Sequence, residues 1–176
     1  DLMLLHQPFG DYYGAWRALE ELYGEGKLRS IGISNFYPDR MVDLCSFSRI
    51  RPMVNQVETH PHNQQTEAQK WMQKYGVQIE AWAPFGEGRG GLFTDGTIAK
   101  IAAKYERTVA QIILRWELQR GIVVIPKSVH IERMIENFNV FDFALSDEEM
   151  AIMATLDKKQ SSFFSHTDPN MVCADG

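Results

Sequence analysis

The sequence contains little cysteine: its 176 residues include two, Cys45 and Cys173, which lie far apart and outside any metal-binding spacing. This excludes a disulfide framework and indicates a reducing compartment. It also lacks a secretory signal and an apolar run long enough to span a bilayer, which favours the cytoplasm. Basic charge is not in excess either. The net charge is −5 with both signs interleaved, so we expect no nucleic-acid partner and no membrane surface.

The residues that are present have the composition of an ordinary globular protein. Hydrophobic residues make up 44% and charged residues 23% of the chain, and the length suits one domain or a large part of one. The chain begins inside an apolar stretch, residues 2–5, with neither an initiator Met nor a turn before it. We therefore expect these residues to be a piece of a longer protein.

Strand and helix patterns alternate along the chain. We predict strands at 2–5, 30–33, 53–57, 77–83 and 122–125, and helices at 13–23, 38–47, 65–75, 98–105, 109–119, 131–138 and 147–156. The first strand is continuously apolar, which predicts burial on both faces. Ser146 and Glu149 predict a capping box on the last helix. Such alternation predicts an α/β fold with a parallel sheet covered by helices.

Ligands of parallel α/β folds bind where the strands end. Those positions hold hydrogen-bonding groups and one aromatic ring: His6, Ser34, Asn35, Gln56, Glu58, Trp82, Lys127 and Ser128. Chance would scatter such residues over both ends of the strands. The pattern therefore predicts one binding site along this edge.

The end of the last strand predicts a phosphate site. Pro126 interrupts the apolar run 122–125, and Lys127 and Ser128 follow where we expect the free amides of the next helix. Arg133, further along that helix, can fork onto a phosphate or stack on a ring. We interpret this corner as a nucleotide-phosphate site. The alternative is a solvated basic turn after a buried strand.

Five segments, in this order and spacing, resemble the second half of an aldo-keto reductase: LLHQP, IGISNF, NQVE, AWAPFG and IPKSVHIERMIENF. The resemblance covers nearly the whole chain and is closest to bacterial members that reduce diketogluconate. It implies a (β/α)8 TIM barrel of which about the last five strand-helix units are present. It also implies an NADPH-dependent oxidoreductase that reduces small aldehydes, ketones or α-dicarbonyls by hydride transfer.

The resemblance assigns a role to each candidate residue. His6 is similar to the catalytic histidine that orients the substrate carbonyl. The cofactor-binding residues that it implies are Ser34, Asn35 and Gln56 at the nicotinamide carboxamide, Trp82 stacked on the nicotinamide, Phe85 and Gly86 along the pyrophosphate, Lys127, Ser128, Val129 and Arg133 at the 2′-phosphate, and Glu136 and Asn137 at the adenine amine. NADPH is favoured over NADH, because Lys127 and Arg133 would otherwise lack the phosphate that pairs with them.

The sequence departs from the family pattern at several points. Ala83 stands where many members have a serine that contacts the pyrophosphate, and Gln7 stands where a tryptophan commonly lines the substrate pocket. The family's aspartate, catalytic tyrosine and lysine come from a region before His6 that these residues do not contain. Reduction of a carbonyl needs a proton donor within reach. We therefore expect the chain alone to be inactive.

An incomplete barrel would also leave two open sheet edges. Either strands outside these residues cover the edges, which we favour and which gives a monomer, or the chain self-associates. A second functional interpretation is a non-catalytic aldo-keto reductase-like protein that binds a nucleotide or a partner protein. A flavin or phosphosugar barrel would use the same phosphate corner but leaves the segments SNF and NQVE unexplained.

Three further patterns have ordinary explanations. His60 and His62 lie near Glu58 without a third ligand at a zinc spacing, so we predict a plain loop and no metal. The glycines of residues 86–91 satisfy GxGxxG, but no helix opens at once, so we predict a loop beside the cofactor. The apolar tail either lines the substrate pocket, as the resemblance implies, or packs on the outer helices. Its residues are Phe163, Phe164, Met171 and Val172.

Overall fold

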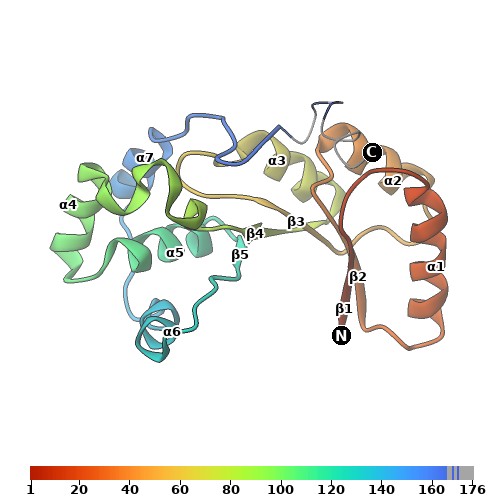
Figure 1. Ribbon diagram of the computed structural model, residues 1–176, viewed down its shortest axis with the longest axis horizontal. Coiled ribbons are helices and arrows are strands. Elements are labelled where there is room, and N and C mark those ends of the chain that lie inside the picture. Colours follow the sequence, from red (N-terminus) through yellow and green to blue (C-terminus); the bar gives the residue numbers. More distant parts are fainter. Residues whose placement is uncertain (166–167, 169, 171–176) are drawn as a thin grey trace. The chain divides into compact units, whose positions relative to one another are not determined.

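The computed structural model describes residues 1–165, 168 and 170 (Figure 1). The chain forms two compact units. Unit 1 comprises Asp1–Val57, Thr66–Ile79 and the chain from Phe163, and unit 2 comprises Glu58–Gln65 and Glu80–Ser162. The strands follow one another in the sheet order β1-β2-β3-β4-β5, and every pairing given below is parallel. This confirms the predicted class of fold.

The elements of unit 1 begin and end close to the predicted positions. They are β1 (Leu2–Leu5), α1 (Tyr12–Gly24), β2 (Ser30–Ser34), α2 (Pro38–Phe47), β3 (Val54–Glu58, its last residue in unit 2) and α3 (Thr66–Tyr75). β2 pairs with β1 and β3, and Ser34 lies opposite Gln56. Gly32 is required in β2, because a Cβ there would lie 2.7 Å from the carbonyl oxygen of Val54. The core includes Trp16, which is 1% exposed.

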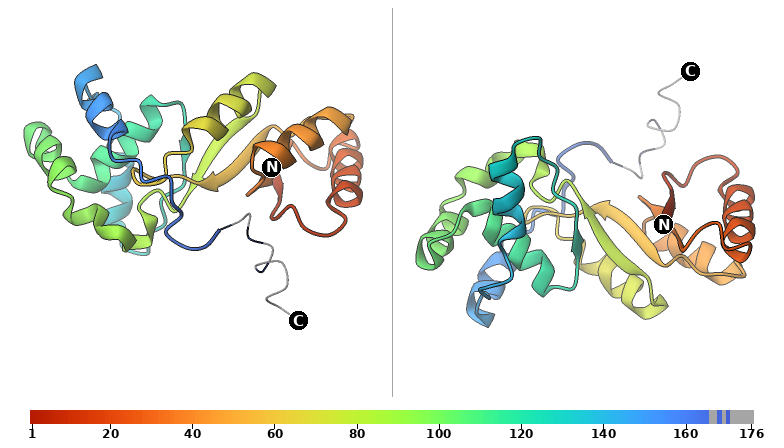
Figure 2. Two further views of the ribbon diagram at one scale, coloured as in Figure 1. Left: turned by 90° about the horizontal axis from the view of Figure 1, so that it is seen from above. Right: turned by 90° about the horizontal axis from the view of Figure 1, so that it is seen from below.

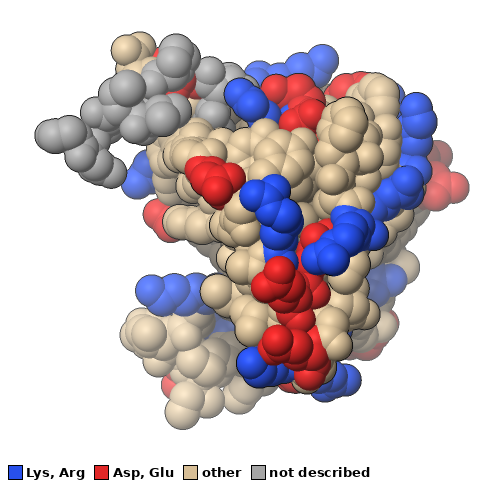
Figure 3. All heavy atoms as spheres, turned by 90° about the vertical axis from the view of Figure 1, so that its right-hand side faces the viewer, with Lys and Arg blue, Asp and Glu red and all other residues tan. Residues whose placement is uncertain are grey.

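The face of unit 1 that carries α1 and α2 mixes both signs of charge (Figure 3). Its ion pairs include the exposed pair Lys27 with Glu25 at 2.7 Å, and Arg49 with the buried Glu20 at 3.3 Å. Cationic and anionic side chains alternate over this face. It therefore offers no broad patch of one sign.

Unit 2 contains the remaining elements. They are β4 (Gln78–Trp82, from Glu80 onward in unit 2), the short helical stretch η1 (Gly86–Thr94), α4 (Gly96–Tyr105), α5 (Val109–Gln119), β5 (Val123–Val124), α6 (Ile131–Phe138) and α7 (Asp147–Ala154). Figure 2 shows α4, α5 and α7 side by side. Ile98, Ile112, Trp116 and Met153 join these helices in one apolar core. The predicted capping box on α7 is confirmed, since the Ser146 hydroxyl accepts from the Glu149 amide.

Three expectations need correction. β1 is not buried on both faces: Leu2 is 38% and Met3 50% exposed, because β2 is the one strand that pairs with β1 among the described residues. β5 is shorter than predicted, and Ile125 is exposed beyond its end. η1 was not predicted as a helical stretch. Five of its residues have non-helical backbone angles, so most of the segment is the predicted glycine-rich loop.

Among the residues that the structure describes, no helix combines the length and the apolar character that a membrane crossing requires.

Candidate cofactor and substrate site

Unit 1 brings together the ends of three strands. The Ser34 hydroxyl donates to the carbonyl oxygen of Gln56 at 2.9 Å, and the Asn35 amide nitrogen does the same at 2.9 Å. The Asn35 side chain donates to the carbonyl oxygen of His6 at 3.1 Å. Asn35 has a φ of 60°, a left-handed conformation that Asn tolerates better than most residues. These four residues, which the sequence predicted as neighbours, form one polar cluster.

The His6 ring is the exposed group of this cluster. Ser34 and Asn35 are 2% and 4% exposed, whereas the His6 side chain lies at the surface. Its imidazole makes no hydrogen bond within the described part of the chain. An exposed imidazole beside buried polar groups can donate to, or accept from, a bound molecule. What the cluster binds stays a prediction.

In unit 2, the last residue of β4 and the turn after it supply three candidate residues. Trp82 and Phe85 are half-buried, and Gly86 is buried. The Gly86 amide donates to the carbonyl oxygen of Ala83 at 2.8 Å, and Ala83 has a φ of 47°, which is strained for a residue with a Cβ. A Cβ on Gly86 would lie 3.3 Å from Leu92. The close packing fixes the course of this turn.

The phosphate corner differs from its predicted geometry. α6 begins at Ile131, as expected, but an extended His130 precedes it and caps it without a side-chain hydrogen bond. Lys127 and Ser128 therefore lie before the first helical turn and not at its free amides. The Ser128 hydroxyl accepts instead from the His130 amide at 3.1 Å. That the cation, the hydroxyl and the helix amides meet at one point stays a prediction.

Two cations of this corner are available to a ligand. Lys127 and Arg133 are exposed, and neither makes a hydrogen bond or an ion pair with a described residue. Val129 is 78% exposed. Asn137, further along α6, is half-buried. An anion bound here would gain charge-assisted hydrogen bonds without displacing an existing partner.

The Glu136 carboxylate is partly engaged within the protein. Its Oε1 accepts from the Thr108 hydroxyl at 2.5 Å, at the start of α5. The Gln111 side chain donates to the carbonyl oxygens of Glu136 at 3.3 Å and Asn139 at 2.8 Å. These contacts hold the C-terminal end of α6 on the first turn of α5. The other oxygen of Glu136 makes no hydrogen bond with a described residue and can serve the predicted adenine contact.

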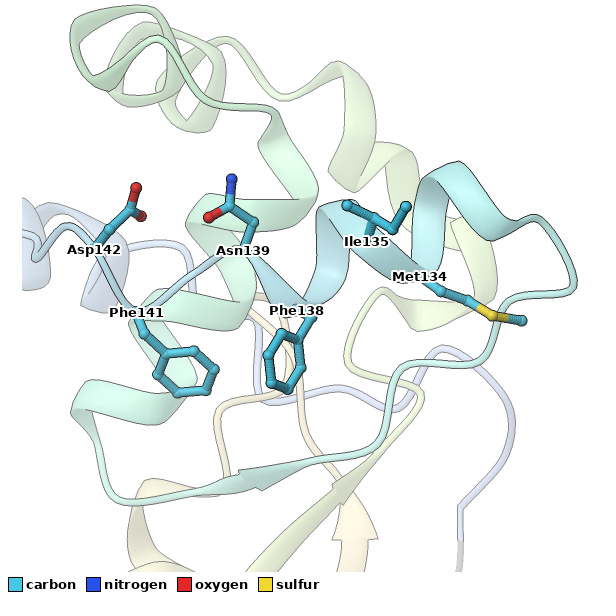
Figure 4. A pocket seen from close by; sticks show the side chains of 6 residues that line it. All are labelled: Met134, Ile135, Phe138, Asn139, Phe141 and Asp142. Carbon is cyan, nitrogen blue, oxygen red and sulfur yellow. The ribbon is translucent and has the colours of Figure 1, made fainter.

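The apolar face of α6 was not predicted to be part of a site. No residue of α6 is buried, and a hollow of about 870 Å³ opens beside it (Figure 4). The residues that line the hollow are Met134, Ile135, Phe138, Asn139, Phe141 and Asp142. Apolar residues at helical spacing over 131–138 are the signal in the sequence that predicts such a face. The hollow lies beside the residues of the phosphate corner.

Residues of the tail are described in part. Phe163 is half-buried, and Phe164 is 39% exposed. Met171, Val172 and Cys173 lie outside the described residues. The two proposed positions of the tail therefore both stay open.

The other cysteine, Cys45, is buried, and burial raises the pKa of its thiol to about 11.

Comparisons with known proteins agree on one family. A model of the aldo/keto reductase family matches residues 1–158. Glyoxal reductase of Bacillus subtilis is 46% identical over 161 residues, which are 91% of this chain and 58% of that protein. Methylglyoxal reductase DkgA of Escherichia coli is 40% identical over 161 residues, or 90% of this chain and 58% of that protein.

Solved structures show the same likeness. An aldo-keto reductase enzyme from a deep-sea metagenome library superposes with a TM-score of 0.90 at 41% identity, over 96% of this chain and 63% of that one. A Bombyx mori aldo-keto reductase, solved in complex with NADP, gives 0.88 at 34% identity, over 93% of this chain and 59% of that one. The chain thus spans less than two thirds of the length of these proteins. Its five parallel units match part of their fold.

Proposed function

Since the chain belongs to the aldo/keto reductase family, we propose that it is part of an NADPH-dependent oxidoreductase that reduces small aldehydes, ketones or α-dicarbonyls to alcohols. The polar cluster of His6, Ser34, Asn35 and Gln56 is the observation that carries this proposal. The names of two relatives, a glyoxal and a methylglyoxal reductase, support the α-dicarbonyl class. The chain spans 58% of each of them, so the activity of the whole protein is inferred.

In unit 1, the cluster supplies the reactive end of the site. Ser34, Asn35 and Gln56 hold the nicotinamide carboxamide, which requires donors and acceptors at fixed positions. The exposed His6 ring orients the substrate carbonyl and donates to the oxygen as negative charge develops on it. NADPH, when bound, supplies the hydride. Donation from His6 lowers the energy of the transition state without a change in covalent structure.

In unit 2, residues at and after the ends of β4 and β5 bind the remaining parts of the cofactor, from the nicotinamide ring to the adenine. Lys127 and Arg133 pair with the 2′-phosphate, which fits two exposed cations that have no partner within the described chain. The Ser128 hydroxyl adds a hydrogen bond, and Val129 lies beside the 2′-phosphate. Trp82 stacks on the nicotinamide and Phe85 and Gly86 follow the pyrophosphate. Glu136 and Asn137 contact the adenine amine.

The 176-residue chain by itself is inactive under this proposal. His6 can polarise a carbonyl, but the resemblance assigns proton donation to a tyrosine and lysine that these residues do not contain. The barrel strands that complete the fold cover the sheet edges, and the complete barrel is a monomer. An NADPH-consumption assay with methylglyoxal tests this. Turnover by the 176-residue chain at the rate of an intact family member would contradict it.

The cofactor assignment is tested by titrating the chain with NADPH and NADH and following cofactor fluorescence. We expect Arg133→Ala to weaken NADPH binding by at least about tenfold, because a charge-assisted hydrogen bond to phosphate contributes about 1.5–3 kcal/mol. NADH binding should be unchanged. Lys100→Ala, which removes an exposed cation of α4, is the matched control and should alter neither affinity. Equal affinities of the unmodified chain for the two cofactors would contradict the assignment.

A further inference from the structure

Glu58, the last residue of β3, carries a fully buried carboxylate that accepts three hydrogen bonds. Its Oε1 accepts from His60 Nε2 at 2.8 Å and from the Ser162 amide at 2.8 Å. Its Oε2 accepts from the Ser161 hydroxyl at 2.5 Å. His60 is also fully buried. Two donors to this carboxylate therefore come from a segment about one hundred residues further along the chain.

The hydrogen-bond network fixes the tautomer of His60. Its Nδ1 accepts from the His62 amide at 3.3 Å, so Nε2 carries the proton that is donated to Glu58. Burial alone would raise the pKa of the Glu58 carboxyl, but the hydrogen bonds from His60, Ser161 and Ser162 outweigh it and lower the pKa below its usual value. Glu58 is therefore a carboxylate at neutral pH, an acceptor matched to three donors.

The segment that follows α7 lies along the loop that follows β3. The Lys158 amide donates to the carbonyl oxygen of His62 at 2.9 Å, and the Gln64 amide donates to the Asp157 carboxylate at 3.1 Å. The Gln64 side chain also donates to the carbonyl oxygen of Met153 at 2.7 Å. These contacts tie residues 153–158 to the loop. Glu58 extends this attachment to Ser161 and Ser162.

The η1 loop meets the same cluster. A Cβ on Gly86 would lie 3.7 Å from both His60 and the Ser162 hydroxyl, and Arg89 donates to the carbonyl oxygen of Ser162 at 3.3 Å. Three loops of unit 2 thus converge on one buried carboxylate. One of them contains Gly86, a residue that we assign to the cofactor.

Two other functions for the cluster fail on its geometry. Both oxygens of Glu58 and both ring nitrogens of His60 already have partners in the protein, so a metal ion would have to displace several hydrogen bonds. A serine nucleophile activated through His60 would need Glu58 and Ser162 on opposite ring nitrogens. Both lie on Nε2, with the Ser162 hydroxyl at 3.2 Å. The cluster is built to hold a segment of chain.

We propose that Glu58 is a positioning residue whose carboxylate, oriented by His60, fixes the start of the C-terminal segment at Ser161 and Ser162. For the effect on substrate we adopt the interpretation in which the tail lines the substrate pocket, so that the residues that follow directly, Phe163 and Phe164, face the carbonyl substrate. Glu58 thereby sets substrate affinity without touching the substrate. The effect on substrate rests on the proposed function above, whereas the attachment of the segment does not.

Hydrogen exchange on the complete protein, followed by mass spectrometry, tests the attachment. Glu58→Gln keeps the shape but replaces one acceptor oxygen by a donor. We expect exchange of the Ser162 amide to accelerate by about tenfold, which corresponds to about one lost charge-assisted hydrogen bond, with α4 and α5 unchanged. Trypsin should also cleave faster after Lys158 and Lys159. Glu148→Gln, at an exposed carboxylate of α7, is the matched control.

Two outcomes of this experiment overturn the attachment. Unchanged exchange at Ser162 would show that Glu58 does not hold the segment. Faster exchange throughout α4 and α5 would show that Glu58 supports the whole unit and has no specific role at the segment. Ser161→Ala removes a single donor and keeps the buried charge. It should give a smaller local acceleration, and no change in this variant would also count against the proposal.

The effect on substrate is measured in the complete protein, with methylglyoxal and NADPH as probes. Glu58→Gln should raise the KM for methylglyoxal by about threefold or more, with kcat and the Kd of NADPH within about twofold. If the unmodified protein binds no NADPH, the proposed function fails while the exchange result still decides the attachment. If exchange accelerates but the KM does not move, the role toward substrate is overturned.

Discussion

α5 and α6 lie in the same unit and contact each other, yet they are stabilised in opposite ways. α5 has seven buried residues, among them Ile112, Ile113 and Leu114 at 0% exposure, and a capping box between Thr108 and Gln111. α6 has no buried residue and no side-chain cap. Burial of α5 thus contributes more to the free energy of unfolding than burial of α6 does. The residues proposed to bind phosphate and adenine lie on or before α6, where packing constrains the choice of side chain little.

Polar contacts between the two helices replace the missing apolar burial. Gln111 and Thr108 bind the C-terminal end of α6, and Arg115 donates to the carbonyl oxygen of Val140 at 3.3 Å. Such hydrogen bonds contribute about 1 kcal/mol each, less than burial of a large side chain. The hydrogen bonds from α5 therefore fix where α6 lies, but they contribute little to the free energy of unfolding.

The largest expected effect is that of Trp116→Ala in α5. Trp116 is 1% exposed and its ring lies 4.5 Å from the Arg120 guanidinium. The truncation should lower the free energy of unfolding by about 3–5 kcal/mol, because it leaves a cavity in the core of unit 2. Urea denaturation followed by circular dichroism measures the loss. A loss below about 1 kcal/mol would mean that α5 is not the main source of stability.

A smaller effect is expected from Glu149→Gln in α7, which packs on α4. The Glu149 carboxylate accepts from Lys104 at 2.7 Å and Tyr105 at 2.5 Å. Burial opposes ionisation, but these bonds and the capping box outweigh it and lower the pKa of Glu149 to about 2. Its contribution is present above the usual pKa of a glutamate and is lost as the pH falls toward 2.

We expect Glu149→Gln to cost on the order of 2 kcal/mol at pH 7, measured by thermal denaturation between pH 2 and pH 7. The difference from the unmodified chain should shrink as the pH falls. Glu136→Gln, on α6, is the matched comparison. Its carboxylate has one hydrogen bond to a described residue, so a smaller loss is expected. An equal loss in both variants would remove the distinction between the two regions.

Glu117→Gln should stabilise the protein. Both carboxyl oxygens of Glu117 in α5 are buried without a hydrogen-bond partner in the described chain. Burial raises the pKa of Glu117 well above its usual value, against the opposing charge of Arg120. A raised pKa means that the folded state binds the extra proton, so stability falls as the pH rises above the unfolded value.

Glu117→Gln removes the titrating group, so stability no longer falls with pH for this reason. The free energy of unfolding of this variant should exceed that of the unmodified chain by about 1 kcal/mol at pH 7, and the difference should widen between pH 5 and pH 8. Denaturant midpoints at each pH measure it. A variant that is less stable at pH 7 would show instead that Glu117 is ionised and paired with Arg120. α5 would then depend on a buried ion pair as well as on apolar packing.

The smallest effect is expected from Phe138→Ala on α6. The side chain is 77% exposed, so its removal should cost less than about 0.5 kcal/mol, as for surface substitutions in general. The same urea denaturation measures it beside Trp116→Ala. A loss above about 2 kcal/mol would mean that the apolar face of α6 is covered in solution. Sedimentation at two protein concentrations would then show whether a second copy covers it.

The sequence by itself determined the order and type of the elements and the family. Apolar spacing, glycine stops and the Ser146 capping box act over a few residues, so they can be read locally. The five segments likewise predicted that His6, Ser34, Asn35 and Gln56 lie together, because parallel strands place their carboxyl ends at one edge of the sheet. The contacts found in unit 1 agree with that prediction.

Only the tertiary structure decided which distant segments meet. The sequence placed Lys127 and Ser128 at the free amides of α6, but the backbone of His130 is extended and separates them. It gave no sign that Glu58 accepts from Ser161 and Ser162, because no local pattern encodes a hydrogen bond between residues about one hundred positions apart. The exposure of α6 was equally unpredictable. Helical periodicity defines an apolar face, but burial depends on what else packs against it.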